Sequence, residues 1–143
     1  MLRGLNPILS PDLLYILRAM GHGDEIVIAD ANFPAESMGQ QVVRLDGISA
    51  TEVLEAVLSV MPLDSFVDDP ASTMQVVDDP ETTPEVVEAF QKIIEKVADN
   101  PAAITSVERF TFYDRAKTAF AIVQTGEKRL YGNIILKKGV IAP

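Results

Sequence analysis

The sequence predicts a single α/β domain, with helices on both faces of a mainly parallel sheet. Its 143 residues fit one domain, and no linker divides them. Segments with helical spacing of apolar residues alternate with short apolar runs typical of strands. With 48 % hydrophobic residues the chain has enough apolar side chains for a core. We therefore expect one domain over residues 1–143, built as a three-layer α/β/α sandwich.

Four segments have the signals of helices. Ser10 is a suitable N-cap before Pro11, and Gly21 ends the segment that follows. Ser49 and Glu52 form a capping-box pattern before a second apolar face, which Pro62 ends. The third segment begins at residues 83–85, and the fourth has a weaker helical signal. The expected helices span residues 10–20, 49–61, 83–97 and 113–120.

Short apolar runs mark the expected strands. Residues 25–30 are apolar and β-branched without alternation, the pattern of a strand buried on both faces of a parallel sheet. Asp30 therefore lies at the C-terminal end of that strand. Two copies of Val-Asp-Asp-Pro, at 67–70 and 77–80, are interpreted as acidic turns. The expected strands or extended segments span residues 25–30, 41–45, 74–77, 107–110, 121–124 and 131–136.

Charge and composition exclude several classes of function. The net charge is −9, which argues against nucleic acid or an anionic membrane as the main partner. The chain has no cysteine, so thiolate metal sites and cysteine nucleophiles are excluded. No signal peptide and no apolar run long enough to cross a bilayer is recognisable, so we expect a cytoplasmic protein. A mean hydropathy of +0.17 favours an apolar subunit interface in a homo-oligomer.

Known metal and cofactor motifs are missing. There is no phosphate-binding loop, G-x-G-x-x-G or H-E-x-x-H, and one histidine without cysteine cannot build the usual zinc site. The paired acids at 68–69 and 78–79 are better interpreted as solvated turns than as weak calcium sites. We therefore expect neither metal nor cofactor.

His22 is the only histidine and the first candidate for acid/base chemistry. Imidazole has an unperturbed pKa of about 6.5, so it can both give and take a proton near neutral pH. Gly21 and Gly23 flank it and would let a ligand approach the backbone closely. An exposed loop histidine with no role is the alternative. Catalysis by His22 predicts a bell-shaped pH–rate profile.

Asp30 is expected beyond the carboxyl end of a strand, where open α/β sheets place their ligand sites. An Asx turn leading to Pro34 would explain it equally well. His22 and Asp30 lie at opposite ends of one strand, roughly 20 Å apart for six residues at ~3.3 Å each. A site that uses both therefore points to a contribution from a second subunit.

Four further side chains could recognise a polyhydroxylated ligand. Arg109 offers a planar fork of donors, and Tyr113 shares its face if the segment between them is helical. Tyr131 and Asn133 place a phenol and an amide on either side of Gly132. The alternatives are a surface ion pair for Arg109 and an edge strand with a bulge at Gly132.

Several stretches along the whole chain resemble the D-ribose pyranase/L-fucose mutarotase family, most closely its L-fucose mutarotase branch. The resemblance is weakest between about residues 64 and 103. The matching stretches are LSPDLL at 9–14, MGHGDEI at 20–26, DANFP at 30–34, PLDSF at 62–66, FYDRA at 112–116 and YGNIILKKGV at 131–140.

The resemblance implies an isomerase that interconverts the anomers of a free monosaccharide without cofactor or metal. It also implies a ring-forming oligomer, commonly a decamer, with sites between subunits. The residues it implies as catalytic are His22 and Tyr113. The residues it implies as sugar-binding are Asp30, Arg109, Tyr131, Asn133 and, on a shorter match, Asp64. L-fucose is the expected substrate, with D-ribose and related sugars as further candidates.

Three alternatives remain at this point. A D-ribose pyranase of the same family is disfavoured by Arg109 and by the stretch 112–115. A sugar-binding protein without turnover would bind the sugar but not exchange its anomers. A purely structural oligomer would show no change in stability when sugar is added.

Overall fold

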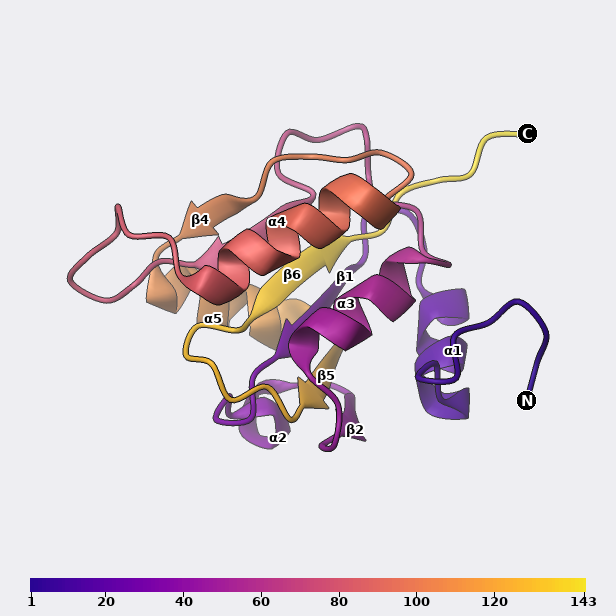
Figure 1. Cartoon of the computed structure of the whole chain (residues 1–143), viewed down its shortest axis with the longest axis horizontal. Coiled ribbons are helices and arrows are strands. Elements are labelled where there is room, and N and C mark those ends of the chain that lie inside the picture. Colours follow the sequence, from indigo (N-terminus) through magenta and orange to yellow (C-terminus); the bar gives the residue numbers. More distant parts are fainter.

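A computed structural model describes all residues, 1–143, as a mixed α/β fold around one six-stranded sheet (Figure 1). The strand order is β2-β5-β1-β6-β3-β4. Only β6 runs antiparallel to its neighbours, and the remaining pairs are parallel. The expected mainly parallel sheet is therefore confirmed. The strands are β1 (Glu25–Ala29), β2 (Val42–Leu45), β3 (Ala71–Met74), β4 (Thr105–Val107), β5 (Ala121–Thr125) and β6 (Ile134–Lys137).

Helices cover both faces of this sheet. In β1, Ile26 and Ile28 face one apolar cluster while Val27 and Ala29 face another, because successive strand side chains point to opposite faces. The first cluster includes residues of α1 (Pro11–Ala19), α3 (Ala50–Leu58) and α4 (Glu85–Val97). The second includes residues of α2 (Ala35–Met38) and α5 (Arg109–Thr118). Figure 1 shows α3 and α4 in front of the strands and α2 and α5 behind.

The helix caps explain why α1 and α3 begin where the sequence predicts. The Ser10 hydroxyl accepts the N–H of Leu13 at 3.2 Å. Ser49 and Glu52 form the predicted capping box, each accepting the other's backbone N–H. These caps satisfy N–H groups that have no partner within the helix. None of the helices combines the length and the apolar character that a membrane span requires.

The third strand lies earlier than predicted. We expected residues 74–77, but β3 spans Ala71–Met74 and is fully buried. The sequence contains no hydropathy signal for this strand, because its residues are small or carry hydroxyl groups. Their burial is compensated by hydrogen bonds, such as the one between the Ser72 and Thr105 hydroxyl groups at 3.1 Å across the strand pair. Val76 and Val77 belong instead to the turn that follows, where Val77 is 43 % exposed.

The segment after β4 also differs from the prediction. An extended conformation over 107–110 is wrong beyond Val107, because α5 begins at Arg109, four residues earlier than expected. The Glu108 carboxylate caps this helix by accepting the N–H groups of Phe110 and Thr111 at 2.8 and 3.2 Å. An acidic N-cap explains how an aromatic-rich segment with strand propensity becomes helical. The four-residue helix α2 was not expected.

Candidate functional site

The predicted site residues form two separate groups at opposite ends of β1. One group lines a pocket of about 230 Å³ and comprises Asp30, Arg109, Tyr113, Tyr131 and Asn133. His22 and Asp64 form the other group and hydrogen-bond to each other. A larger groove of about 490 Å³ lies between α4 and β4 but includes none of the predicted residues. The candidate site residues of the chain therefore lie in two groups at opposite ends of one sheet.

The strand directions produce this division. Asp30 directly follows β1, and Asn133 directly precedes the antiparallel β6, so both lie at the same end of the sheet. Arg109 and Tyr113 come from the first turns of α5, which places them on one helix face as expected. His22 precedes β1 and therefore lies at the other end.

Asp30 and Asn133 bind each other in both directions. The N–H of Asp30 donates to Asn133 Oδ1 at 2.8 Å, and Asn133 Nδ2 donates to Asp30 Oδ2 at 2.9 Å. The other carboxylate oxygen accepts the N–H of Asn32 at 3.0 Å. Both side chains are almost fully buried. The Asx turn proposed as an alternative is thus present, together with a fixed carboxylate at the pocket.

Burial raises the pKa of Asp30 above its ordinary value, and the negative charge of Glu127 adds to this effect. Hydrogen bonds from Asn32, Asn133 and the Phe33 backbone oppose it by stabilising the carboxylate. The two carboxylate oxygens retain acceptor capacity after these internal hydrogen bonds. Asp30 can therefore accept hydrogen bonds from ligand hydroxyl groups.

Aromatic rings form the walls of the pocket. Phe33 and Tyr113, which both line the pocket, lie 5.8 Å apart between ring centroids, and Phe110, outside the lining, lies 6.4 Å from Tyr113. The Arg109 guanidinium stacks on the Phe110 ring at 4.6 Å, which orients it without an ion-pair partner. Tyr131 has a positive φ of 63°, and its hydroxyl accepts the N–H of Val77 at 3.1 Å. The pocket thus combines apolar faces with free polar donors.

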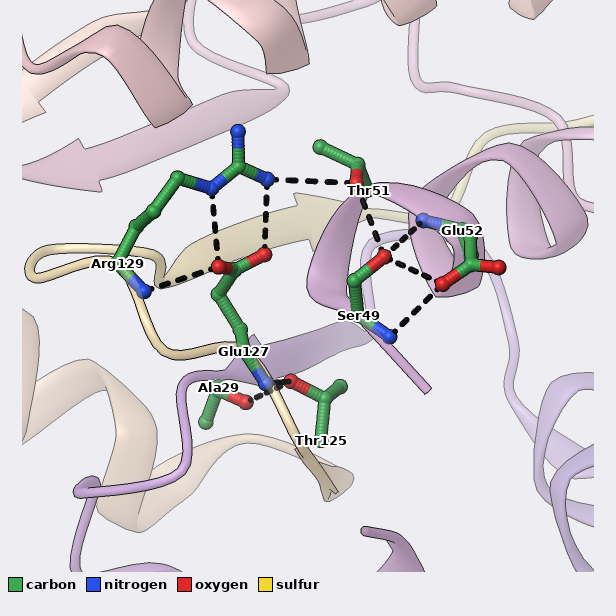
Figure 2. A network of polar contacts seen from close by, with 7 residues as sticks. All are labelled: Ala29, Ser49, Thr51, Glu52, Thr125, Glu127 and Arg129. Atoms are coloured by element: carbon green, nitrogen blue, oxygen red, sulfur yellow. Dashed lines mark hydrogen bonds and ion pairs between the residues drawn. The ribbon is translucent and has the colours of Figure 1, made fainter. Parts of the chain in front are cut away.

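An ion pair between the buried Glu127 and the partly exposed Arg129 supports the loop that carries Tyr131 and Asn133. Arg129 donates from Nε and a terminal nitrogen to the two Glu127 carboxylate oxygens, each at 2.9 Å (Figure 2). Glu127 is only 4 % exposed. Hydrogen bonds from Arg129 hold the pKa of Glu127 below its ordinary value, against the effect of burial. Glu127 is therefore a fixed negative charge behind the pocket.

The same network joins this loop to α3 and to β1. Arg129 contacts the Thr51 hydroxyl at 3.4 Å, and Thr51 bonds in turn to Ser49 (Figure 2). The Thr125 hydroxyl donates to the carbonyl oxygen of Ala29, next to Asp30. At Gly132, a Cβ atom would lie 2.6 Å from Glu127 Cγ. Glycine is thus required where the loop passes over Glu127, and the proposed strand bulge at Gly132 is not formed, since β6 begins at Ile134.

At the other end of the sheet, His22 Nε2 lies 3.1 Å from Asp64 Oδ1. The His22 side chain is 46 % exposed and Asp64 only 2 %. Phe66 packs against the imidazole with ring centroids 5.3 Å apart. The histidine is therefore an oriented loop side chain rather than a free one.

The protonation of Asp64 determines the tautomer of His22. Burial raises the pKa of Asp64, but hydrogen bonds from Phe66 N–H and His22 outweigh it and bring the pKa below its ordinary value. An ionised carboxylate only accepts hydrogen bonds. Nε2 therefore carries the proton that points at Asp64, and in the neutral ring Nδ1 keeps a lone pair free to accept a proton.

Sequence reasoning missed several residues of the site. Phe33, Met74, Val77 and Leu130 line the pocket, and Phe66 covers the imidazole. Phe33 lies within the turn that follows Asp30, which was the one available signal. The sequence contains no signal for Glu127, because a buried acidic residue in a turn has the same sequence pattern as an exposed one. No group of three or more histidine or acidic side chains is close enough to hold a metal ion.

Fold and site together define an α/β protein with a small pocket suited to a polyhydroxylated ligand. Residues 3–141 match the family described as RbsD / FucU transport proteins, and the chain belongs to this family. It is 48 % identical over 140 residues to an L-fucose mutarotase of Actinobacillus pleuropneumoniae, covering 98 % of this chain and 97 % of that protein.

Solved structures give the same assignment of fold. A fucose mutarotase from Streptococcus pneumoniae, crystallised with L-fucose, superposes with a TM-score of 0.92 at 45 % identity, over 99 % of this chain and all of that one. Bacillus subtilis RbsD, crystallised with D-ribose, superposes with a TM-score of 0.75 at 22 % identity, over 99 % and 100 % of the two chains, and supports the fold alone.

Proposed function

We propose that the chain is an isomerase that interconverts the α and β anomers of free L-fucose. The observation that supports this best is the pocket of Asp30, Asn133, Arg109 and two tyrosines, in a chain 45 % identical to a mutarotase crystallised with L-fucose. Its size and its mixture of polar donors and aromatic walls suit one monosaccharide.

The reaction needs one base and one acid. Removal of the proton from the anomeric hydroxyl forms a carbonyl at C1 while the bond from C1 to the ring oxygen breaks. The ring oxygen takes a proton at the same time, and closure on the other face of C1 reverses these transfers. His22 Nδ1 can accept the first proton, and the resulting imidazolium can return it, while Nε2–H stays bonded to Asp64.

The pocket residues then have binding roles. The Asp30 carboxylate accepts sugar hydroxyl protons, and Asn133 fixes that carboxylate through its side-chain amide. Arg109 donates to hydroxyl oxygens from its stacked position on Phe110. Tyr131 belongs to the same binding group. Tyr113 lies at the pocket wall, where its hydroxyl can assist proton transfer at the ring oxygen or the anomeric oxygen.

Catalysis at one site requires His22 and Asp30 to come from different subunits. Within one chain they lie at opposite ends of β1, whose five residues span roughly 17 Å at ~3.3 Å per residue. A head-to-tail contact brings the His22 end of one subunit to the Asp30 end of the next, and repeated contacts of this kind close into rings. We expect such a ring, with a decamer of two stacked rings as the specific assembly.

The substrate preference follows from the side chain at position 109. An arginine there can hold a sugar hydroxyl through two donors, and this favours L-fucose over D-ribose in our account. A D-ribose pyranase remains the alternative within the family. The cytoplasmic location expected from the sequence stays a prediction.

Exchange NMR on the anomeric protons tests the proposal. L-fucose and D-ribose are measured in parallel with the wild-type protein and with His22→Ala. We expect faster exchange for L-fucose, and a loss of about 10²–10⁴-fold in His22→Ala, because proton transfer by a placed side chain contributes that much. Faster ribose exchange would instead favour a pyranase.

Two further outcomes distinguish the non-catalytic alternatives. If sugar binds but exchange in His22→Ala equals that in the wild-type protein, catalysis by His22 is wrong, and if both equal the uncatalysed rate, the chain is a binding protein without turnover. If neither sugar changes the melting temperature of the protein, the chain is a structural oligomer.

A further inference from the structure

Lys138 contacts both sides of the short loop that carries His22. Its ammonium group donates to the carbonyl oxygens of Leu17 and Met20, at 2.8 and 2.6 Å. Its own carbonyl oxygen accepts the N–H of Gly23 at 2.9 Å. His22 thus lies between two residues, Met20 and Gly23, that are both hydrogen-bonded to one lysine.

The side-chain contacts occupy the end of α1. The last carbonyl groups of a helix have no partner within it, and a positive charge there interacts favourably with the helix dipole. Leu17 provides such a carbonyl group, and Met20 is the C-cap residue. The ammonium group is partly buried, and burial together with the nearby Arg18 lowers the pKa of Lys138 while Asp24 opposes this. Lys138 therefore ties the helix end to the sheet.

The backbone contacts extend the pairing of β1 with β6 beyond the strands. The N–H of Lys138 donates to the carbonyl oxygen of Asp24 at 2.9 Å, in addition to the Gly23 contact. The neighbouring Lys137 accepts the N–H of Asp64 at 3.1 Å. The backbone beside His22 and the backbone of Asp64 are thus both hydrogen-bonded to the same end of β6.

We propose that Lys138 is a positioning residue for His22, because it fixes the backbone on both sides of the imidazole relative to Asp64. The role in catalysis rests on the proposed function, whereas the role in orienting the imidazole does not. Without the ammonium group the carbonyl groups of Leu17 and Met20 lose their partner, and the end of α1 can move. A displacement of His22 then breaks its hydrogen bond with Asp64.

The single histidine makes this orientation measurable directly. Long-range ¹H–¹⁵N correlation spectra of the imidazole report its tautomer, and no other histidine contributes signals. In the wild-type protein we expect the Nε2–H form. In Lys138→Met, which keeps the aliphatic stem, we expect a mixture of tautomers. Lys92→Met is the matched control, since Lys92 is an exposed lysine of α4.

Steady-state exchange kinetics with L-fucose give the second readout. We expect kcat of Lys138→Met to fall by about tenfold or more, since small misplacements of a catalytic group have effects of this order or larger. KM should change less than about twofold, because in the proposed shared site the sugar is held by the Asp30 pocket of the neighbouring subunit. Lys138→Arg, which keeps a cationic donor, should recover part of both the tautomer and kcat.

The proposal is overturned if the imidazole signals or kcat of Lys138→Met match those of Lys92→Met. It is also overturned if the fall in apparent kcat of Lys138→Met equals its loss of folded protein, and Lys138→Arg, verified as folded by its melting curve, behaves like Lys138→Met. If the wild-type protein exchanges neither sugar, the proposed function fails, and the imidazole spectra alone then decide the positioning role.

Discussion

Asn133 and Asp30, 103 positions apart in the chain, hold each other through two hydrogen bonds of opposite direction. One bond joins the Asp30 backbone N–H to the amide oxygen, and the other joins the amide nitrogen to the carboxylate. The pair forms because β6 is antiparallel to β1, so that the residue before one strand meets the residue after the other. The Asp30 carboxylate is therefore oriented by the pairing of the two strands.

Truncation of this amide should destabilise the protein. In Asn133→Ala the buried N–H of Asp30 loses its partner, and the carboxylate loses one of its donors. We expect the free energy of unfolding to fall by about 1–3 kcal/mol, the usual cost of an unsatisfied buried polar group. Urea denaturation measures this. Asn32→Ala is the control, because the exposed Asn32 contributes only its backbone N–H, and an equal loss in both variants would contradict the account.

A methyl group at position 132 should disturb the loop beneath the pocket. The added Cβ of Gly132→Ala meets Glu127 Cγ at 2.6 Å and the Arg129 carbonyl oxygen at 3.1 Å. We expect a loss of about 1–3 kcal/mol in stability, as for other overpacked sites, and weaker L-fucose binding in calorimetry. Gly47→Ala is the matched control for Gly132→Ala, since nothing lies within 4 Å of its added Cβ. Unchanged L-fucose binding in Gly132→Ala would show that sugar binding does not depend on the position of this loop.

The Asp64 carboxylate should be needed for turnover but not for sugar binding. In Asp64→Asn the amide can donate as well as accept, so the Nε2–H tautomer of His22 is no longer enforced. We expect kcat to fall about tenfold or more, as for other histidines oriented by an aspartate, with the dissociation constant for L-fucose unchanged. Asp68→Asn, at an exposed acid of the same loop, should behave like the wild-type protein. A binding defect of the size of the kcat defect would place Asp64 among sugar-binding residues instead.

The Glu127–Arg129 pair predicts a specific pH dependence of stability. Hydrogen bonds from Arg129 lower the pKa of Glu127 below its ordinary 4.5. A lowered carboxyl pKa stabilises the folded state fully above the unfolded pKa, and this contribution is lost as pH falls through the lower folded value. Glu127→Gln should therefore be about 1–3 kcal/mol less stable than the wild-type protein at pH 7, a value moderated because Arg129 is 39 % exposed.

The difference between the two proteins should shrink below about pH 4.5, the ordinary pKa of the unfolded glutamate. Denaturation curves at pH 7 and at acid pH measure this difference. The exposed Glu88→Gln serves as control. A difference that stays constant with pH would mean that packing, rather than the charge of Glu127, stabilises the loop.

Local signals allowed most of the fold to be predicted. Ser10, Ser49 and Glu52 are caps whose chemistry depends only on nearby backbone, and the buried run of β1 is apolar throughout. The strand β3 could not be placed, because Ser72 and Thr73 are buried through hydrogen bonds and neighbours from distant parts of the chain. Likewise, the helix at Arg109 depends on one acidic cap, which outweighs the strand propensity of its aromatic residues.

Five of the predicted site residues line one pocket, but the contacts of the site could not all be predicted. The resemblance to a family suggested His22, Asp30 and Asn133, and strand length alone showed that His22 and Asp30 lie far apart. The pairing of His22 with Asp64 joins residues 42 positions apart and has no local signal. The fixation of His22 by Lys138 likewise depends on the antiparallel course of β6, which short apolar runs do not reveal.

In the proposed ring, one catalytic site combines the His22 end of one subunit with the Asp30 end of another. Co-expression of His22→Ala with Asp30→Asn, followed by isolation of oligomers that contain both chains, tests it most directly. Each variant alone should exchange L-fucose anomers poorly. In a mixed ring about a quarter of the shared sites receive an intact half from each neighbour, so exchange should rise toward a quarter of the wild-type rate. Activity that stays at the average of the two single variants would contradict a site shared between subunits.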